Sequence, residues 1–298
     1  DSYYKNKFNI TNEDIQKLES AFSREFTEGC FSGDSVFNKK NPSGFSKIDK
    51  KEYFVNVKSI NIKRDKINPE LPIIQVKSAL KKQILVRVYN KKDAISAEKS
   101  GADIIYYDIL FNDFKDVKNS VKIPVFGVTP RIMFDSDVPN ILNKIKLNSP
   151  DGILAGNLGM LNLGLKIPIH LDYNCNCFND YCLDFFENLG AFAIISPELS
   201  IKEQSEFKNK NFASFVHGKI RLMTLAHKLA EGFLTDEKKF RFKVNKIYNG
   251  SEILNEKEIG LFNKAKKLRD SGINNFFIDT ENDVENIVKI YKQILEGK

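Results

Sequence analysis

The stretch ILVRVYNKKDAISAEKSGADIIYYD, residues 84–108, decides the fold class of this protein. It opens with a short apolar run, continues through a segment predicted to be helical at 91–100, turns at Gly101 and enters a second apolar run at 103–110. Short continuous apolar runs are typical of strands buried on both faces, and a helix between two such runs is typical of parallel strands. The stretch therefore predicts two parallel strands joined by a covering helix.

The same pattern repeats along the rest of the chain. Further strands are predicted at IPVFGV (123–128), DGILAG (151–156), IPIHLD (167–172), AFAIIS (191–196), FASFVHG (212–218), FRFKVNKIY (240–248) and NFFIDT (275–280). Helices are predicted between several of them, at 138–147, 178–189 and 201–208, and a last helix at 283–297. About eight such units predict an α/β fold, a (β/α)8 TIM-like barrel over residues 81–298. An open doubly wound sheet is the alternative, although no glycine-rich phosphate or dinucleotide motif follows the first strand.

Residues 1–80 are predicted to form a separate N-terminal extension. Apolar side chains at helical spacing behind an Asn or Thr cap predict a helix at 11–26. The stretches EYFVNVKSINIK (52–63) and PIIQVK (72–77) predict short strands. The first residue is Asp1 and not methionine, so we expect the chain to be part of a longer protein.

Composition narrows the class of protein. Hydrophobic residues make up 42% of the 298 residues, enough for a large core, and no apolar run reaches the roughly 20 residues that span a bilayer. Four cysteines in a chain of this length, without a secretory signal, favour a reduced, cytoplasmic setting. The formal net charge of +7 favours an anionic partner such as RNA, with a general Lys-rich composition as the alternative.

In a barrel of this kind the functional site lies at the carboxyl ends of the strands. The polar residues predicted there are Arg87, Tyr89, Tyr107, Asp108, Thr129, Arg131, Asn157, Asp172, Asn174, Ser196, Glu198, His217, Asn245 and Asp279. We expect them to supply the catalytic and binding side chains.

Three of these residues are the predicted catalytic groups. His217 could donate a hydrogen bond or a proton, since histidine titrates near neutral pH, and its alternative role is structural, with Gly218 permitting a tight turn. Glu198 could act as an acid or base, or could contribute to the cap of the helix that begins near Ser200. Asp172 completes the set.

Five further residues are the predicted substrate-binding groups: Asn157, Asn174, Arg87, Tyr107 and Arg131. Asn offers both a donor and an acceptor, which suits base edges and amides. A network that holds neighbouring loops is the alternative for Asp172 and the two Asn residues, because buried polar groups need partners in any case.

The cluster CNCFNDYC contains Cys175, Cys177 and Cys182. Three thiolates could hold a metal with Cys30 or His170 as a fourth ligand, but the spacing is not a standard metal pattern, and buried free cysteine is common. The sequence has no HExxH or GxSxG motif, so a peptidase would need another nucleophile, such as a Cys–His pair.

The order of the strand-end motifs resembles peptidase family U32, the collagenase-like family. The matching pieces are GADIIYYD, DGILAGNLGML, HLDYNCNCFN, LGAFAIISPELS, FVHGKIRLM, IYNGSEIL and SGINNFFIDTEND, and they cover residues 83–298. AFSREFTEGCFSGD resembles the stretch that follows a first barrel in longer members, so the resemblance implies an N-terminal barrel as a partner. The resemblance also implies a TIM-like barrel and one of several activities: proteolysis, or hydroxylation of transfer RNA, ribosomal RNA or ubiquinone precursors.

Several hydroxylating members carry an iron–sulfur cluster on four cysteines. Here the stretch after the HG pair has no cysteine, and His227 stands about where one is expected. We therefore expect no cofactor in this chain. Three functions remain open: part of an RNA base-hydroxylating protein, a non-catalytic barrel that binds RNA or protein, and a peptidase. For RNA, a basic rim and stacking tyrosines are the expected contacts: Arg87, Arg131, Arg221, Arg241 and Lys243, with Tyr89, Tyr106 and Tyr107.

Overall fold

The computed structural model describes residues 71–79 and 81–298. The helix predicted at 11–26 and the strands predicted at 52–63 lie outside the described residues, so the proposed N-terminal extension stays a prediction. The stretch 72–77 was predicted to be a strand, but it forms only an isolated parallel bridge, between Lys77 and Asn209.

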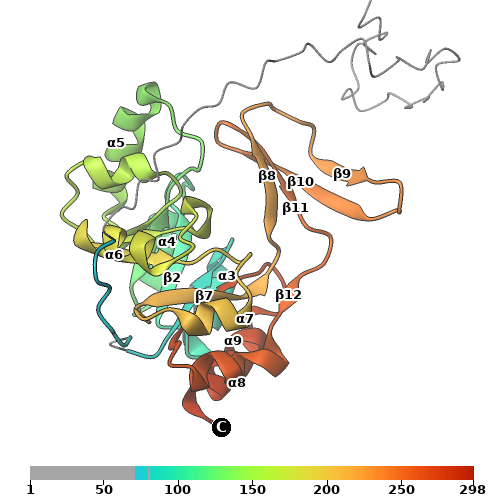
Figure 1. Ribbon diagram of the computed structural model, residues 1–298. Coiled ribbons are helices and arrows are strands. Elements are labelled where there is room, and N and C mark those ends of the chain that lie inside the picture. Colours follow the sequence, from blue (N-terminus) through green and yellow to red (C-terminus); the bar gives the residue numbers. More distant parts are fainter. Residues whose placement is uncertain (1–70, 80) are drawn as a thin grey trace, which may run out of the picture. The chain divides into compact units, whose positions relative to one another are not determined.

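Eight parallel strands close into a barrel (Figure 1). They are β1 (Gln83–Arg87), β2 (Ile104–Asp108), β3 (Val125–Val128), β4 (Gly152–Ala155), β5 (Ile169–Leu171), β6 (Ala191–Ile194), β7 (Phe212–Gly218) and β13 (Asn275–Asp279). Each strand pairs with the next, and β13 pairs with both β7 and β1. The predicted TIM-like barrel is confirmed, and the open doubly wound sheet is excluded.

Helices follow most barrel strands and cover the outside of the barrel. They are α3 (Lys91–Lys99), α4 (Phe114–Ser120), α5 (Val138–Asn148), α6 (Asp180–Asn188), α7 (Ile201–Glu206), α8 (Phe262–Asp270) and α9 (Val284–Glu296). Short 3-10 turns occupy η1 (Asp135–Asp137), η2 (Leu158–Asn162) and η3 (Tyr173–Cys175). Side-chain caps start several helices: Asn90 caps α3, and Ser200 forms a capping box with Glu203 at α7. No helix in the described part of the chain is long and apolar enough to cross a bilayer.

Strand alternation divides the core into two layers. On β1, Leu85 belongs to the cluster inside the barrel, whereas Ile84 and Val86 belong to the cluster between strands and helices. On β2, Tyr106 points inside and Tyr107 outside. Because successive side chains of a strand point to opposite faces, both layers require apolar residues, which explains the continuous apolar runs.

An antiparallel sheet is inserted between β7 and β13. It contains β8 (Arg221–Leu225), β9 (Gly232–Thr235), β10 (Arg241–Ile247) and β11 (Gly250–Leu254), in the order β8-β11-β10-β9, and β12 (Ile259–Gly260) pairs with β7. The prediction that FRFKVNKIY belongs to the barrel was wrong, because this stretch contains β10. Its alternation of apolar and basic residues is typical of an antiparallel strand with one solvated face.

The inserted sheet is fastened to the barrel on both sides of the barrel mouth. The Lys243 ammonium group donates to Glu281, in the loop after β13, at 2.8 Å. The turn between β10 and β11 reaches the segment after β3, where Asn249 donates to Asp137 at 2.6 Å and to the carbonyl of Ile132 at 3.1 Å. The inserted sheet, orange in Figure 1, thus contacts the loops at the carboxyl ends of two barrel strands.

Candidate functional site at the barrel mouth

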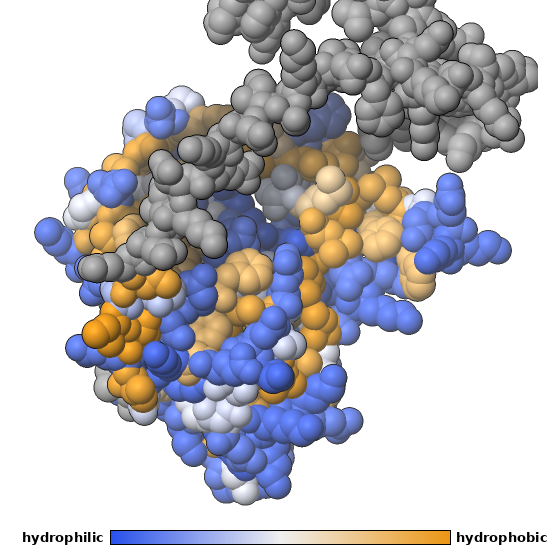
Figure 2. Space-filling view, viewed as in Figure 1, coloured by the Kyte–Doolittle hydropathy of each residue, from blue (hydrophilic) through white to orange (hydrophobic). Residues whose placement is uncertain are grey.

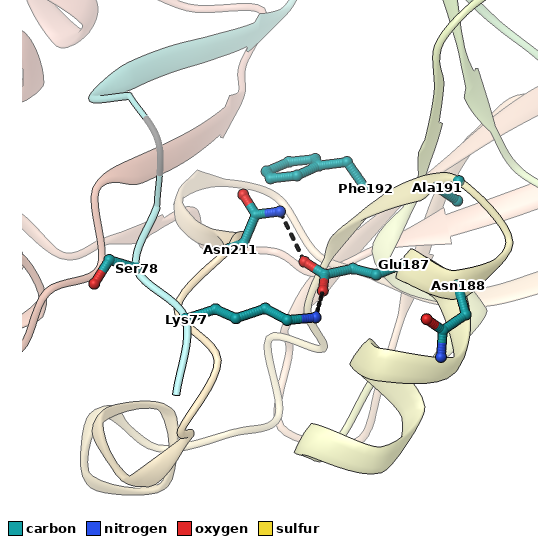
Figure 3. A pocket seen from close by; sticks show the side chains of 8 residues that line it. Lys77, Ser78, Glu187, Asn188, Ala191, Phe192 and Asn211 are labelled. Carbon is teal, nitrogen blue, oxygen red and sulfur yellow. Dashed lines mark hydrogen bonds and ion pairs between the residues drawn. The ribbon is translucent and has the colours of Figure 1, made fainter. Parts of the chain in front are cut away.

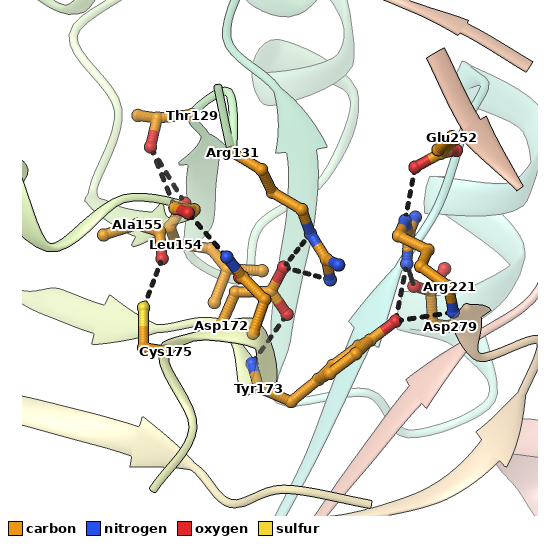
Figure 4. A network of polar contacts seen from close by, with 12 residues as sticks. Thr129, Arg131, Leu154, Ala155, Asp172, Tyr173, Cys175, Arg221, Glu252 and Asp279 are labelled. Atoms are coloured by element: carbon orange, nitrogen blue, oxygen red, sulfur yellow. Dashed lines mark hydrogen bonds and ion pairs between the residues drawn. The ribbon is translucent and has the colours of Figure 1, made fainter. Parts of the chain in front are cut away.

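A buried ion pair joins the loops after β3 and β5. Arg131 donates to Asp172 Oδ2 from Nε at 3.1 Å and from Nη2 at 2.7 Å, and Asp172 Oδ1 accepts from the Tyr173 backbone N–H at 2.8 Å (Figure 4). The Arg131 guanidinium also lies 4.6 Å from the centroid of the Tyr173 ring. Asp172 thus holds Arg131 in a fixed position at the mouth.

A second charged cluster centres on Arg221 of β8. Its Nη1 donates to Asp279 Oδ2 at 2.5 Å and its Nε donates to Glu252 Oε2 at 2.7 Å. Its Nη2 donates to the Tyr89 hydroxyl at 2.8 Å, and that hydroxyl donates to Asp279 Oδ1 at 2.6 Å. Arg221 therefore ties the inserted sheet to the ends of β1 and β13.

Tyr173 connects the two clusters. Its hydroxyl accepts from the Arg221 backbone N–H at 3.1 Å and from Arg221 Nη1 at 3.3 Å, while its ring lies under Arg131 (Figure 4). The sequence pointed to neither Tyr173 nor Glu252. Tyr173 directly follows the HLD strand end, but only the fold brings it to Arg221, 48 residues away.

The arginines in this network stabilise the ionised form of the buried carboxylates. Burial by itself would raise the pKa of Asp279, but the Arg221 and Arg87 guanidinium groups bring that pKa below its usual value. The pKa of Glu252 is lowered against burial by the same two arginines. Both carboxylates are therefore ionised at neutral pH, and neither is poised to donate a proton.

Arg87, at the end of β1, is one cation at the mouth that forms no ion pair with another residue in the described part of the chain. Burial and the Arg221 charge oppose its ionised form, but Tyr89, Asp279 and Asp172 outweigh them, so the pKa of Arg87 is raised. Its guanidinium lies 5.5 Å from the Tyr89 ring centroid and forms no hydrogen bond with another described residue. Because a guanidinium carries five donors, Arg87 can bind an anion or a carbonyl in the mouth.

The two predicted asparagines belong to the loop network. The Asn157 side chain accepts from Gly159 N–H at 2.8 Å and donates to the Arg131 carbonyl at 3.3 Å. Asn174 donates to the Gly156 carbonyl at 2.8 Å, and its Oδ1 is a buried acceptor without a partner among the described residues. This arrangement matches the alternative role of holding neighbouring loops, and leaves Asn174 Oδ1 free for a donor.

The structure does not place His217 in the mouth, contrary to the prediction. In the β7–β13 pairing, Phe277 lies opposite Phe215 but Ile278 lies opposite His217, so the extra residue forms a β-bulge. The bulge turns His217 outward, against Phe262 and Tyr291, with ring centroids 5.1 and 5.8 Å away. Its Nε2 lies 3.5 Å from Glu258, and burial lowers the pKa of His217. The position fits a structural role.

The residue after His217 must be a glycine, because β7 and β13 approach each other closely there. Its φ is +134°, and a Cβ atom would lie 1.9 Å from the carbonyl oxygen of Asp279. The close approach of β7 to β13 therefore excludes any side chain at Gly218. His217 and Gly218 thus fix the backbone at the end of β7. This is the structural role that was the alternative to catalysis in the sequence analysis.

Two other predicted residues, Tyr107 and Glu198, also lie apart from the network, whereas Asn245 joins it through Glu252. The Tyr107 hydroxyl donates to Asp113 at 3.0 Å and its ring packs outside the barrel, because strand alternation points Tyr106 inward instead. Glu198 is exposed, and the α7 cap uses Ser200 and Glu203 in its place. Asn245 lies within β10 of the inserted sheet, where it donates to Glu252 at 3.2 Å.

The cysteines do not form a ligand set in the described part of the chain. No group of three or more His, Cys, Asp or Glu side chains there is placed to hold a metal. Burial raises the pKa of the Cys175 thiol to about 12, and Cys175 donates to the Ala155 carbonyl at 3.7 Å. Burial also raises the pKa of Cys177.

His170 is held inside the barrel. Its Nδ1 lies 2.6 Å from the Tyr106 hydroxyl, and its ring packs between Phe126 and Phe192, with both centroids at 4.7 Å. Burial lowers the pKa of His170 to about 3. Neither His170 nor His217 is hydrogen-bonded to Cys175, so the described residues contain no assembled Cys–His pair.

A cavity of about 650 Å³ lies at the opposite end of the barrel (Figure 3). Glu187 accepts from Lys77 at 2.8 Å and from Asn211 at 2.7 Å there. These residues fasten the segment before β1 to α6 and to the start of β7. The amino ends of barrel strands serve stability, so we assign this cavity a structural role.

The closed barrel and its charged mouth define the class: a (β/α)8-barrel protein with its candidate site at the carboxyl ends of the strands. The family model described as peptidase family U32 matches residues 131–297, more than half of the chain. The chain belongs to peptidase family U32, as the order of its motifs predicted.

Comparison with solved structures returns other barrels. Two structures of phosphoribosylanthranilate isomerase from Thermotoga maritima, one of them a monomeric form, each share 10% identity over 72% of this chain and 99% of that chain, with TM-scores of 0.43 and 0.42. The spore cortex-lytic enzyme SleL of Bacillus megaterium QM B1551 shares 8% identity over 74% of this chain and 75% of that chain, with a TM-score of 0.38. No curated protein matches the chain. Such low identities carry no functional argument.

Proposed function

We propose that this barrel is the substrate-binding part of a cytoplasmic protein that hydroxylates bases of transfer or ribosomal RNA. The observation that carries the proposal is Arg87, whose guanidinium lies at the barrel mouth without a hydrogen-bonding partner among the described residues. Phosphate oxygens and base carbonyls are the groups that arginine binds in RNA.

The surroundings of Arg87 support the same assignment. Arg131 and Arg221 are already occupied by Asp172 and Asp279, so they fix the geometry of the mouth while Arg87 remains free to bind. Tyr89 adds a ring beside the guanidinium. The net charge of +7 favours a polyanionic partner. The proposal assigns binding and orientation of the base to these residues and leaves the oxidation step to a group outside them, with an N-terminal barrel of the same protein as the proposed partner.

The peptidase alternative has less support. A cysteine nucleophile acts as a thiolate, and burial raises the pKa of Cys175 to about 12. The bulge in β7 turns His217 away from the mouth, so it is not placed to activate a nucleophile there.

The proposal is tested by mass spectrometry of ribosomal and transfer RNA nucleosides from a strain that lacks the gene. We expect one hydroxylated nucleoside to disappear and to return with the full-length gene. It should return with Lys289→Ala, which removes an exposed charge on α9, but not with Arg87→Ala. An unchanged nucleoside profile in the deletion strain would exclude RNA hydroxylation and favour the non-catalytic or peptidase function.

A further inference from the structure

The two faces of the inserted sheet differ in chemistry. In the antiparallel register Lys243 lies opposite Phe233 and Asn245 lies opposite Glu252, so these four side chains share one face with Arg241. Glu252 binds Arg221 of the mouth network, and Lys243 binds Glu281 of the loop after β13. The aromatic and basic face is therefore the one turned toward the barrel mouth.

The other face is occupied by the chain itself. Val244 and Ile253 form a small apolar cluster with Leu229, and Leu225 and Phe242 pack against it. Leu229 lies in the segment between β8 and β9 and covers this cluster, and its N–H donates to the Ser251 hydroxyl at 2.7 Å. Apolar contacts on that face stabilise the sheet. The face toward the mouth is therefore the one on which a ligand can bind.

A cleft of about 280 Å³ separates the mouth-facing side from the barrel. Phe233, Lys219 and Lys243 line it together with Tyr89 and Arg221. Phe233 is 55% exposed, although a phenylalanine on a sheet is usually covered. The Arg241 guanidinium lies 4.3 Å from its ring centroid. The cleft therefore joins an exposed aromatic ring, flanked by cations, to Tyr89, whose ring faces Arg87. Three carboxylates also line it, those of Glu258, Asp279 and Glu281.

Charge is concentrated in the same segment. Residues 219–257 contain nine Lys and Arg against five Asp and Glu, a net charge of +4 within a chain whose total is +7. In Figure 2 hydrophilic side chains gather at the far end of the inserted sheet, next to exposed apolar ones. The Lys243–Glu281 pair is partly exposed, and pairs of this kind are weak, so a phosphate can compete for the Lys243 ammonium group.

We propose that the mouth-facing side of the inserted sheet binds single-stranded RNA and leads one nucleotide to Arg87. Phe233 is the stacking platform for a base, and Lys219, Arg241 and Lys243 contact phosphates. Aromatic rings beside basic side chains are the common means of binding single strands without reading their sequence. This inference rests on the proposed function and adds to it the surface that carries the RNA.

The test measures the affinity of the full-length protein for a fluorescein-labelled single-stranded oligouridylate by fluorescence anisotropy at two salt concentrations. Phe233→Ala should weaken binding roughly tenfold, because one stacked base is lost. Lys243→Ala should weaken binding and lower the slope of log K against log salt by about one. The matched controls are Phe185→Ala, a 59% exposed phenylalanine on α6, and Lys289→Ala, and both should bind as the wild type does.

Equal affinities of Phe233→Ala and the wild type would overturn the inference. The inference would also be overturned if a labelled oligoglutamate bound as tightly as the oligouridylate and kept its affinity in Phe233→Ala. The surface would then recognise negative charge alone. Either result leaves the nucleoside test of the proposed function unaffected. Conversely, an unchanged nucleoside profile would end the proposed function, whereas Phe233-dependent binding of the oligouridylate would still establish the RNA surface.

Discussion

Arg221 Nη1 lies 2.5 Å from Asp279 Oδ2, although 58 residues separate the two in the chain. Both side chains are almost completely buried, at 2% and 3% exposure. Their pairing fixes the inserted sheet to the last barrel strand, so the geometry of the mouth depends on it.

Arg221→Ala is expected to destabilise the protein by about 3–5 kcal/mol, because it leaves Asp279 buried without its counter-charge. The free energy of unfolding from urea titration checks this value. Lys243→Ala, which breaks a partly exposed pair with Glu281, is the control and should cost at most about 1 kcal/mol. Equal effects of the two substitutions would show that the Arg221 pair is not a buried ion pair.

Arg87→Ala and Arg131→Ala should separate binding from stability. Arg87 has no hydrogen-bonding partner among the described residues, so its removal should cost less unfolding free energy than Arg131→Ala, about 1–2 kcal/mol for the weaker support of Asp279 and Glu252, while it abolishes restoration of the nucleoside. Arg131→Ala leaves Asp172, which is 2% exposed, without its partner and should cost about 3–5 kcal/mol. A large loss of stability in Arg87→Ala would reassign Arg87 to the structural network.

Gly218→Ala should cost about 3 kcal/mol or more, because a Cβ atom would lie 1.9 Å from the Asp279 carbonyl oxygen at a φ of +134°. Gly164→Ala is the matched control: its φ is also positive, at +65°, but no atom lies within 4 Å of the added carbon. It should cost about 1 kcal/mol. Urea titration of both variants measures the difference, and similar midpoints would contradict the close approach of β7 and β13.

Stability should fall as the pH drops from about 6.5 toward 3, in part because of His170. Burial lowers the pKa of His170 to about 3, whereas in the unfolded chain it lies near 6.5, so the unfolded state binds the proton first as the pH falls. The contribution of His170 is therefore complete above pH 6.5 and is lost across this window, at up to about 1.4 kcal/mol per pH unit.

The measurement is the unfolding free energy at pH 7 and pH 5. The wild type should lose about 2 kcal/mol more than His170→Phe between these two values. A double variant with Tyr106→Phe controls for the hydroxyl that loses its partner. If wild type and His170→Phe show the same pH dependence, His170 is accessible to protons in the folded protein.

Several features followed from the sequence alone. Continuous apolar runs alternating with helical segments predicted the barrel, since strands buried on both faces carry few polar residues within them. The polar residues that end these runs predicted the mouth, and Arg87, Arg131 and Asp172 were among them. These patterns can be read within a short stretch of sequence, because every residue of a buried strand has to be compatible with burial.

Only the tertiary structure decided which of those residues meet. One extra residue in β7 turns His217 away from the mouth, and strand alternation points Tyr107 outward instead of Tyr106. The network of Arg221 joins groups up to 132 residues distant in the chain. Arg221 itself lies on β8, a strand of the inserted sheet that the sequence did not predict. Ion pairs and bulges depend on how separate strands align in space, and local sequence patterns do not determine that alignment.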